Sequence, residues 1–216
     1  MPIAKTIIAP SLLDPGNHAL ILIDHQYLRL LTVRSHETTV VMNAATLLAK
    51  GAKLFGVKTL LTTALAAGQA LVREIQEVFP EQRPIDRTSL NAFEDERVVS
   101  WVEAASRGKL VLAGLGTESC VAMTALSALS AGYEVYVIAD ASGGASKESH
   151  EMAMERITAA GAVPLAAGAY LKELQRDWAR DATAAEALAI FQQHGGGYGE
   201  GLPSGLDMGA PKGRVH

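Results

Sequence analysis

Residues 110–121 read LVLAGLGTESCV and join a strand-like run to a candidate helix. The first part of the stretch is apolar without interruption, which is typical of a strand covered on both faces of a sheet. The second part passes two glycines and places Cys120 in or near the first turn of the following helix. A strand, a glycine-bearing loop and a helix in this order favour an α/β protein.

Segments of the same two kinds alternate on both sides of this stretch. Runs of strand length lie at 19–23, 59–62, 110–113, 134–138 and, more weakly, 162–166. Helical spacing is found over 38–55, 70–79, 95–107, 118–131 and 146–160. Because strands and helices alternate, we expect a parallel sheet with right-handed crossover helices.

Composition and charge bound the function classes. The 216 residues are 49% hydrophobic, with a mean hydropathy of +0.16, which excludes collagen-like, disordered and disulfide-scaffold chains. A net charge of −4 without a basic block argues against a nucleic-acid partner. No apolar run approaches the roughly 20 residues of a bilayer span. The single cysteine and the N-terminus without a secretory signal predict a cytoplasmic protein.

The composition changes near residue 181. We expect residues 1–181 to form the main domain, followed over 182–216 by a terminal helix at 182–193 and a tail rich in Gly and Pro. The tail from residue 195 has too few large apolar side chains to bury a core of its own. It is therefore either disordered or an arm held by another subunit.

Polar residues that follow the strand-like runs are candidates for chemistry. In an open parallel sheet the ligand crevice lies beyond the carboxyl ends of the strands. Asp24 comes directly after the apolar run 20–23. A carboxylate there is costly to bury unless it does chemistry or caps a helix, and both readings stay open.

Cys120 and Arg87 are the other two candidates. A thiol at a helix N-terminus is favoured as a thiolate, and the same free amides hold a developing oxyanion. The alternative for Cys120 is a small buried apolar residue. Arg87 lies in the polar segment 84–95, which we expect to be a loop over the same edge of the sheet. It either lowers the pKa of the thiol or pairs with a surface acid.

Several motifs together carry a resemblance. Asp24, Arg87, the segment GLGTESCV at 114–121 and the segment GYEVYVIADAS at 132–142 resemble the isochorismatase-like cysteine hydrolase superfamily. The segment RTSLNAFED at 87–95 is similar to its YcaC-related branch. The resemblance covers about residues 15–180. It implies a Rossmann-like three-layer α/β fold with a central parallel sheet of about six strands flanked by helices, and homo-oligomers, octamers in this branch.

The resemblance also implies roles for individual residues. The catalytic triad is expected at Asp24, Arg87 and Cys120, and the oxyanion hole at the amides of Gly116, Thr117 and Cys120. Most of the superfamily has Lys where this chain has Arg87; because Arg keeps its proton, Arg87 is a fixed charge and Asp24 does the acid and base work. A cis peptide bond is expected before or after Gly116.

The remaining site predictions concern substrate and metal. Gln26, Asn91 and Phe93 are candidates for lining the substrate site. Nicotinamidase relatives hold a metal with an Asp and His cluster after the second strand, where this chain has TTALA at 62–66. Its six histidines lack ligand spacing, so we predict no metal site and no cofactor.

Three functions follow from these residues. The first is a hydrolase that cleaves the C–N bond of a small amide or related carbonyl substrate, outside peptides, through a thioester on Cys120. The second is vinyl-ether hydrolysis of the isochorismatase type, which uses no cysteine nucleophile. The third is a non-catalytic assembly protein in which Cys120 is a core residue or a redox-sensitive thiol.

Overall fold

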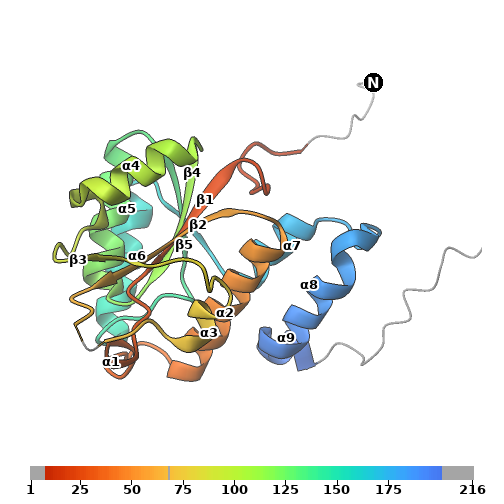
Figure 1. Cartoon of the computed structure of the whole chain (residues 1–216), viewed down its shortest axis with the longest axis horizontal. Helices are drawn as coiled ribbons and strands as arrows, with labels where there is room; N and C mark the ends of the chain where they lie inside the picture. The colour runs from red at the N-terminus through yellow and green to blue at the C-terminus, as the bar shows by residue number, and fades with distance from the viewer. Residues whose placement is uncertain (1–7, 68, 201–216) are drawn as a thin grey trace, which may run out of the picture.

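Six parallel strands form the centre of the computed structural model, which describes residues 8–67 and 69–200 (Figure 1). The strands are β1 (His18–Ile23), β2 (Lys58–Ala64), β3 (Ile85–Arg87), β4 (Lys109–Gly114), β5 (Glu134–Ile138) and β6 (Val163–Leu165). Their order in the sheet is β3-β2-β1-β4-β5-β6. The expected Rossmann-like α/β fold with a six-stranded parallel sheet is confirmed.

The strand order reverses between β1 and β4. The chain builds β1, β2 and β3 toward one side of the sheet and then returns to the other side of β1 with β4. In this register Ile23 lies beside Thr62 of β2 and Gly114 of β4. The residues that follow β1, β2 and β4 are therefore neighbours, at the point where open α/β sheets bind ligands.

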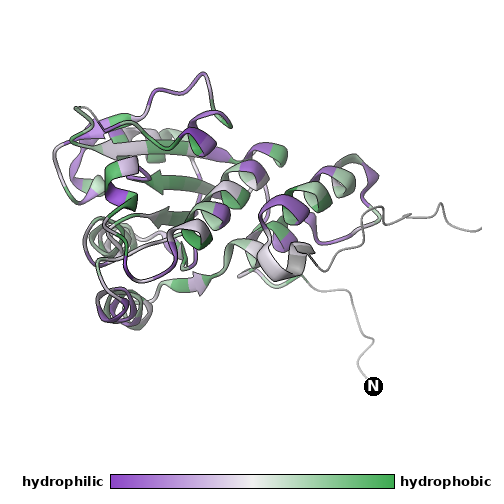
Figure 2. Cartoon of the chain, turned by 90° about the horizontal axis from the view of Figure 1, so that it is seen from below, coloured by the Kyte–Doolittle hydropathy of each residue, from purple (hydrophilic) through white to green (hydrophobic). Residues whose placement is uncertain are grey.

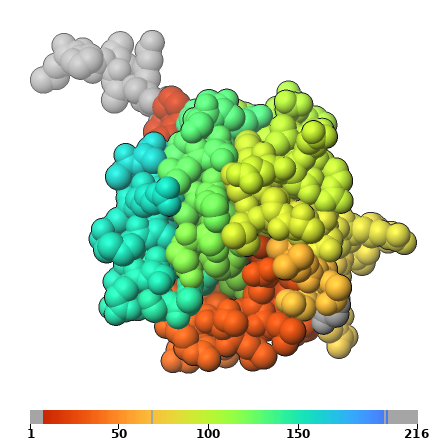
Figure 3. All heavy atoms as spheres, turned by 90° about the vertical axis from the view of Figure 1, so that its left-hand side faces the viewer, coloured from red at the N-terminus to blue at the C-terminus, as the bar shows by residue number. Residues whose placement is uncertain are grey.

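Helices cover both faces of the sheet (Figure 1). On one face lie α2 (Thr38–Leu54), α7 (Ala167–Gln175) and α8 (Asp181–His194). On the other face lie α4 (Glu96–Ala105), α5 (Ala122–Ser130) and α6 (Lys147–Ala159), which stand side by side in Figure 3.

The side chains of β1 alternate between these two layers. Leu20 and Leu22 belong to the core under α2, and Ile21 and Ile23 to the core under α5. Because both faces are covered, the whole strand is buried and its residues after His18 are apolar. The hydrophobic strands lie between helices with polar outer faces (Figure 2).

Four elements differ from the sequence expectation. The loop expected over 84–95 contains β3, which pairs Ile85–Arg87 with the end of β2 but is too short to show a strand period. The helix expected over 70–79 is one turn, α3 (Arg73–Gln76), because Leu71 pairs with Gln26 in extended backbone just before it. The helices α7 and α1 (Tyr27–Leu30) were not expected.

The C-terminal helix is found where the sequence places it, as α8. It packs on α2 and α7, and Phe191 contacts the ring of Trp178 edge to face. The short helix α9 (Gly196–Glu200) follows where only a tail was expected. The rest of the tail, 201–216, and with it the arm prediction, lies outside the described residues. Within 8–67 and 69–200, no helix has the length and apolarity needed to cross a bilayer.

Candidate active site

The fold brings Asp24, Arg87 and Cys120 together at the carboxyl ends of β1, β3 and β4. Arg87 Nη2 donates to Asp24 Oδ1 at 2.6 Å, and both side chains are fully buried. Cys120 is 1% exposed, and its thiol is close enough to Asp24 that each group changes the pKa of the other. The three predicted triad residues therefore form one buried cluster.

Asp24 sits in a strained backbone conformation. Its φ is +58°, in the left-handed region that residues other than glycine rarely adopt. Its amide donates to the Thr62 carbonyl of β2 at 3.0 Å, which fixes the corner where the chain leaves the sheet. Asp24 Oδ2 is buried and has no hydrogen-bond partner among the described atoms. Strain and an unpaired oxygen at one residue are typical of a functional site.

Arg87 connects Asp24 to the loop after β3. Its Nη1 donates to the carbonyls of Ser89 at 2.5 Å and Leu90 at 3.1 Å, while Nη2 also reaches Thr62 Oγ1 at 3.4 Å. The guanidinium is therefore held in place by the loop as well as by the carboxylate. The alternative that Arg87 pairs with a surface acid is wrong, because its side chain is buried against Asp24.

Cys120 lies on a single π-helical turn, η2 (Thr117–Val121), which leads into α5. Gly116 begins this turn with a φ of +79°. A Cβ on Gly116 would lie 2.8 Å from Ser119 Oγ and 3.7 Å from Cys120 Sγ. Glycine is therefore favoured by both the backbone conformation and the close approach of the Ser119 hydroxyl.

The predicted oxyanion turn is hydrogen-bonded to the loop after β5. The amides of Gly116 and Thr117 both donate to the Gly143 carbonyl, at 2.8 and 3.1 Å. The expected cis bond is wrong for the described residues, which contain none; the left-handed Gly116 reverses the chain instead. In this conformation two of the three predicted amides are engaged, and Cys120 remains the candidate donor.

His150 is a contact of this turn that the sequence reasoning missed. Its Nδ1 lies 2.9 Å from Thr117 Oγ1, and its ring meets His36 edge to face at 4.6 Å between centroids. Ser35 Oγ in turn hydrogen-bonds His36 and accepts from the Gly144 amide. A lone His on α6 (Lys147–Ala159) gave no sequence signal, because its partners are far away along the chain.

The three predicted substrate residues bond within the protein. Gln26 is buried; its Nε2 donates to the Gln69 carbonyl at 2.9 Å and its Oε1 accepts from the Ala64 amide at 3.0 Å. Asn91 Oδ1 accepts from the Phe93 amide and caps η1 (Ala92–Glu94). The Phe93 ring packs edge to face on Tyr133. In this structure the three residues hold the loops that surround the cluster.

Burial sets the acid–base properties of the cluster. It raises the pKa of the Cys120 thiol, and the negative charge of Asp24 raises it further, while Arg87 opposes both effects. Arg87 lowers the pKa of the thiol as expected from the sequence, but burial and Asp24 outweigh it, so the net shift is upward. Burial also raises the pKa of Asp24 against the opposing charge of Arg87. The resting pair is a thiol beside a carboxylate with increased basicity.

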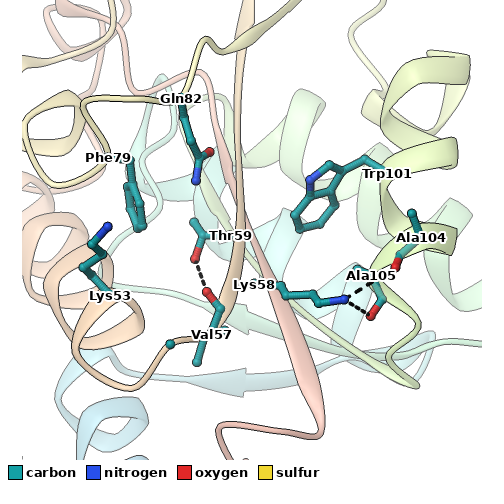
Figure 4. Close-up of a pocket in the computed structure, with 10 residues that line it drawn as sticks. Lys53, Val57, Lys58, Thr59, Phe79, Gln82, Trp101, Ala104 and Ala105 are labelled. Atoms are coloured by element: carbon teal, nitrogen blue, oxygen red, sulfur yellow. Dashed lines mark hydrogen bonds between the residues drawn. The ribbon is translucent and has the colours of Figure 1, made fainter.

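A separate hollow lies at the amino ends of the strands, on the opposite side of the sheet from the cluster. It measures about 540 Å³ and is lined by Lys58 at the start of β2, Phe79 after α3 and Trp101 in α4, among others (Figure 4). Among the described residues no three His, Cys, Asp or Glu side chains are grouped as metal ligands.

Comparisons with known proteins agree with the α/β fold. The isochorismatase domain model matches residues 18–168. The probable hydrolase YcaC of Escherichia coli strain K12 is 37% identical over 186 residues, which cover 84% of this chain and 88% of the relative.

Two solved structures superpose closely on the described chain. The YcaC gene product of Escherichia coli, described as an octameric hydrolase of unknown specificity, gives a TM-score of 0.81 at 34% identity and covers 87% of this chain and 93% of its own. YcaC from Pseudomonas aeruginosa, with hexane-2,5-diol and covalent acrylamide, gives 0.81 at 35% identity and covers 87% and 94%. The chain belongs to the isochorismatase family of hydrolases, in the branch that contains YcaC.

Proposed function

We propose that the protein is a cysteine hydrolase that cleaves a C–N bond outside peptides, in a small amide or related carbonyl substrate. The observation that carries the proposal is the buried contact of the Cys120 thiol with an Asp24 carboxylate already fixed by Arg87. A cysteine that serves only core packing needs no carboxylate beside it. Burying a carboxylate oxygen without a hydrogen-bond partner costs free energy, so packing alone does not explain this arrangement.

The proposed reaction has two halves. Asp24 takes the thiol proton as Cys120 Sγ attacks the carbonyl carbon, and the C–N bond breaks while Asp24 returns that proton to the leaving amine. Water then attacks the thioester, giving a proton to Asp24, and the C–S bond breaks as the proton returns to the thiolate. Arg87 keeps its proton throughout and holds Asp24 in position.

The raised pKa values suit these roles. A thiol with a raised pKa is protonated at rest, so the attack needs a base, and Asp24 is the carboxylate that faces it. Burial makes Asp24 a better proton acceptor than an exposed carboxylate. The Pseudomonas relative contains covalent acrylamide, an electrophile of the kind that thiolates attack, which supports a nucleophile in this branch.

Assembly and location are part of the proposal. The described surface leaves large apolar side chains exposed just beyond the ends of β1, β2 and β3: Tyr27, Leu28, Leu31, Leu65 and Leu90. We propose that they meet other subunits in a homo-oligomer, as the octameric Escherichia coli relative supports. We also propose a cytoplasmic location, because a reducing compartment keeps the free thiol of Cys120 from oxidation.

The test is alkylation of the native protein with iodoacetamide, read by intact mass, because Cys120 is the single cysteine. We expect wild type to be modified in the folded state, with an apparent thiol pKa above the ordinary value of about 8.5. A panel of small amides is then screened for ammonia release. Cys120→Ala should abolish release, and Asp24→Asn should slow it at least about a hundredfold.

Each alternative function has its own outcome in this experiment. A thiol that reacts only after unfolding identifies Cys120 as packing and favours the assembly protein. Turnover of a vinyl ether that survives Cys120→Ala favours the isochorismatase reaction. Either result overturns the cysteine mechanism.

A further inference from the structure

Arg29 is a second arginine beside the cluster that the proposed reaction does not use. It lies on α1, one turn after the corner formed by Asp24, and its side chain is half-buried. Its Nη2 donates to the Ala64 carbonyl at 3.2 Å, and its Nε faces Gln26 Oε1 at 3.3 Å. Gln26 follows β1 and Ala64 ends β2, so the guanidinium lies across the carboxyl ends of the two strands next to Arg87.

Neither partner of Arg29 carries a charge. Within residues 8–67 and 69–200, no carboxylate oxygen lies within 4.0 Å of this guanidinium. Two acids of the same edge are bound elsewhere, Asp86 to Thr63 Oγ1 and the Ala66 amide, and Glu118 to the Ala145 amide.

The positive charge of Arg29 nevertheless acts on Asp24 and lowers the pKa of its carboxyl group. Asp24 supplies one negative charge and Arg87 already pairs with it at 2.6 Å. With Asp24 ionised, the group of Asp24, Arg87 and Arg29 therefore carries one positive charge in excess. His25, the other titratable neighbour on this corner, adds none near neutral pH, because burial lowers its pKa to about 4.

We infer that Arg29 binds an anionic group of the substrate, so that the substrate class is a small amide carrying a carboxylate or a similar oxyanion. The inference rests on the proposed function of Cys120. A planar guanidinium offers paired N–H donors that match a carboxylate, and Nη1 makes no hydrogen bond in the described part of the chain. Partial burial strengthens such a charge-assisted bond relative to open water.

The test compares two alkylating reagents of nearly equal size, iodoacetate and iodoacetamide. In both, Cys120 Sγ forms the new S–C bond and iodide leaves, but only iodoacetate carries a charge. We expect Arg29→Gln to lower the rate with iodoacetate about tenfold more than the rate with iodoacetamide, as for one charge-assisted hydrogen bond. Arg29→Lys should restore part of the loss.

Arg73→Gln is the matched control. It removes one positive charge from an exposed side chain that pairs with Glu77, so it tests the effect of net charge alone. We expect it to leave the ratio of the two rates unchanged. If Arg29→Gln slows both reagents equally, Arg29 only holds the loop after β2, and the inference is overturned. An unchanged ratio in Arg29→Gln overturns it as well.

A second measurement separates this inference from the proposed function. Succinamate and its neutral diamide, succinamide, are compared as stabilising ligands in thermal unfolding, which needs no reactive thiol. Succinamate should raise the melting temperature of wild type and Arg73→Gln but not of Arg29→Gln. A wild-type thiol inert to both reagents overturns the cysteine mechanism. Equal stabilisation of all three proteins by succinamate overturns the role of Arg29.

Discussion

The amino edge of the sheet, where the strands begin, and the carboxyl edge, where they end, differ in what they hold. The amino edge has a hollow without acidic groups among its described lining residues, and the carboxyl edge has a cluster of buried charged groups. At the amino edge a hollow of about 540 Å³ opens beside the start of β2. At the carboxyl edge Asp24, Arg87 and Cys120 are buried together. The hollow of about 540 Å³ is therefore not at the edge that holds the candidate catalytic groups. Opposed charges that are expensive to bury mark the site better than volume does.

The side chains around the hollow explain this contrast. Lys58 Nζ donates to the Ala105 carbonyl at the end of α4, at 3.1 Å, and Lys53 Nζ lies 5.7 Å from the Phe79 ring centre (Figure 4). None of the ten described residues that line the hollow is a cysteine, a histidine or a carboxylate. Both lysines there contribute to packing between elements.

The largest difference between the edges is expected when one acid is removed from each. Asp24→Asn leaves Arg87 buried without its counter-charge, and we expect it to lower the free energy of unfolding by about 3–5 kcal/mol. Glu134→Gln removes the exposed partner of Lys109 at the amino edge, where the two charged atoms are 3.7 Å apart, and should cost below about 1 kcal/mol.

Urea denaturation of the two variants measures this difference. Lys109 keeps the carbonyls of Pro10 and Leu12 as acceptors in Glu134→Gln, so its charge stays solvated by hydrogen bonds. Equal losses in both variants would mean that the buried pair contributes no more than the surface pair, and the two edges would not differ in the cost of an unpaired charge.

The second prediction concerns the two histidines at the ends of β1. Burial lowers the pKa of His18, at the amino end, and of His25, just past the carboxyl end, to about 4 each. Since the folded pKa lies below the unfolded value of 6.5, each contributes stability above pH 6.5 that is lost as pH falls toward 4. Each shift corresponds to about 3 kcal/mol.

Unfolding free energies between about pH 7 and pH 4.5 measure this effect at both edges. His18→Gln and His25→Gln should each flatten the pH dependence by a similar amount, because burial is the common cause. The Tyr170 hydroxyl and the Ala141 carbonyl are the respective contacts of the two Nε2 atoms. A pH dependence that is unchanged in both variants would assign acid sensitivity to other groups.

The smallest expected effect compares two left-handed glycines. Gly56 at the amino edge has a φ of +65° and no atom within 4 Å of the position that a Cβ would take, so Gly56→Ala should cost about 1 kcal/mol. Gly116 at the carboxyl edge is also in the left-handed region, but a Cβ there would lie 2.8 Å from Ser119 Oγ. Gly116→Ala should therefore lower the free energy of unfolding by about 2 kcal/mol.

Alkylation of Cys120 distinguishes the two glycine variants more clearly than stability does. The added methyl group of Gly116→Ala lies 3.7 Å from Sγ and should slow the reaction with iodoacetamide, whereas Gly56→Ala should react like wild type. Equal rates in both variants would show that the approach to the thiol does not pass Gly116.

Much of the fold was predictable from the sequence because it depends on local patterns. The apolar runs of β1, β4 and β5 are unbroken, and the segment 38–54 has a clear helical period. β3 was not predictable, because three residues show no period and its pairing with β2 is set by the sheet. The helix α3 was shortened by contacts of Leu71 and Val72 with residues beyond β1.

The sequence by itself determined the α/β class, the alternation of the main strands and helices, and the placement of Asp24 and Cys120 after strands, because these follow from neighbouring residues. Only the tertiary structure decided the protonation of the thiol, the engagement of the Gly116 amide and the lack of a charged partner for Arg29 among the described residues. These properties depend on burial and on groups distant along the chain, and no local pattern records them.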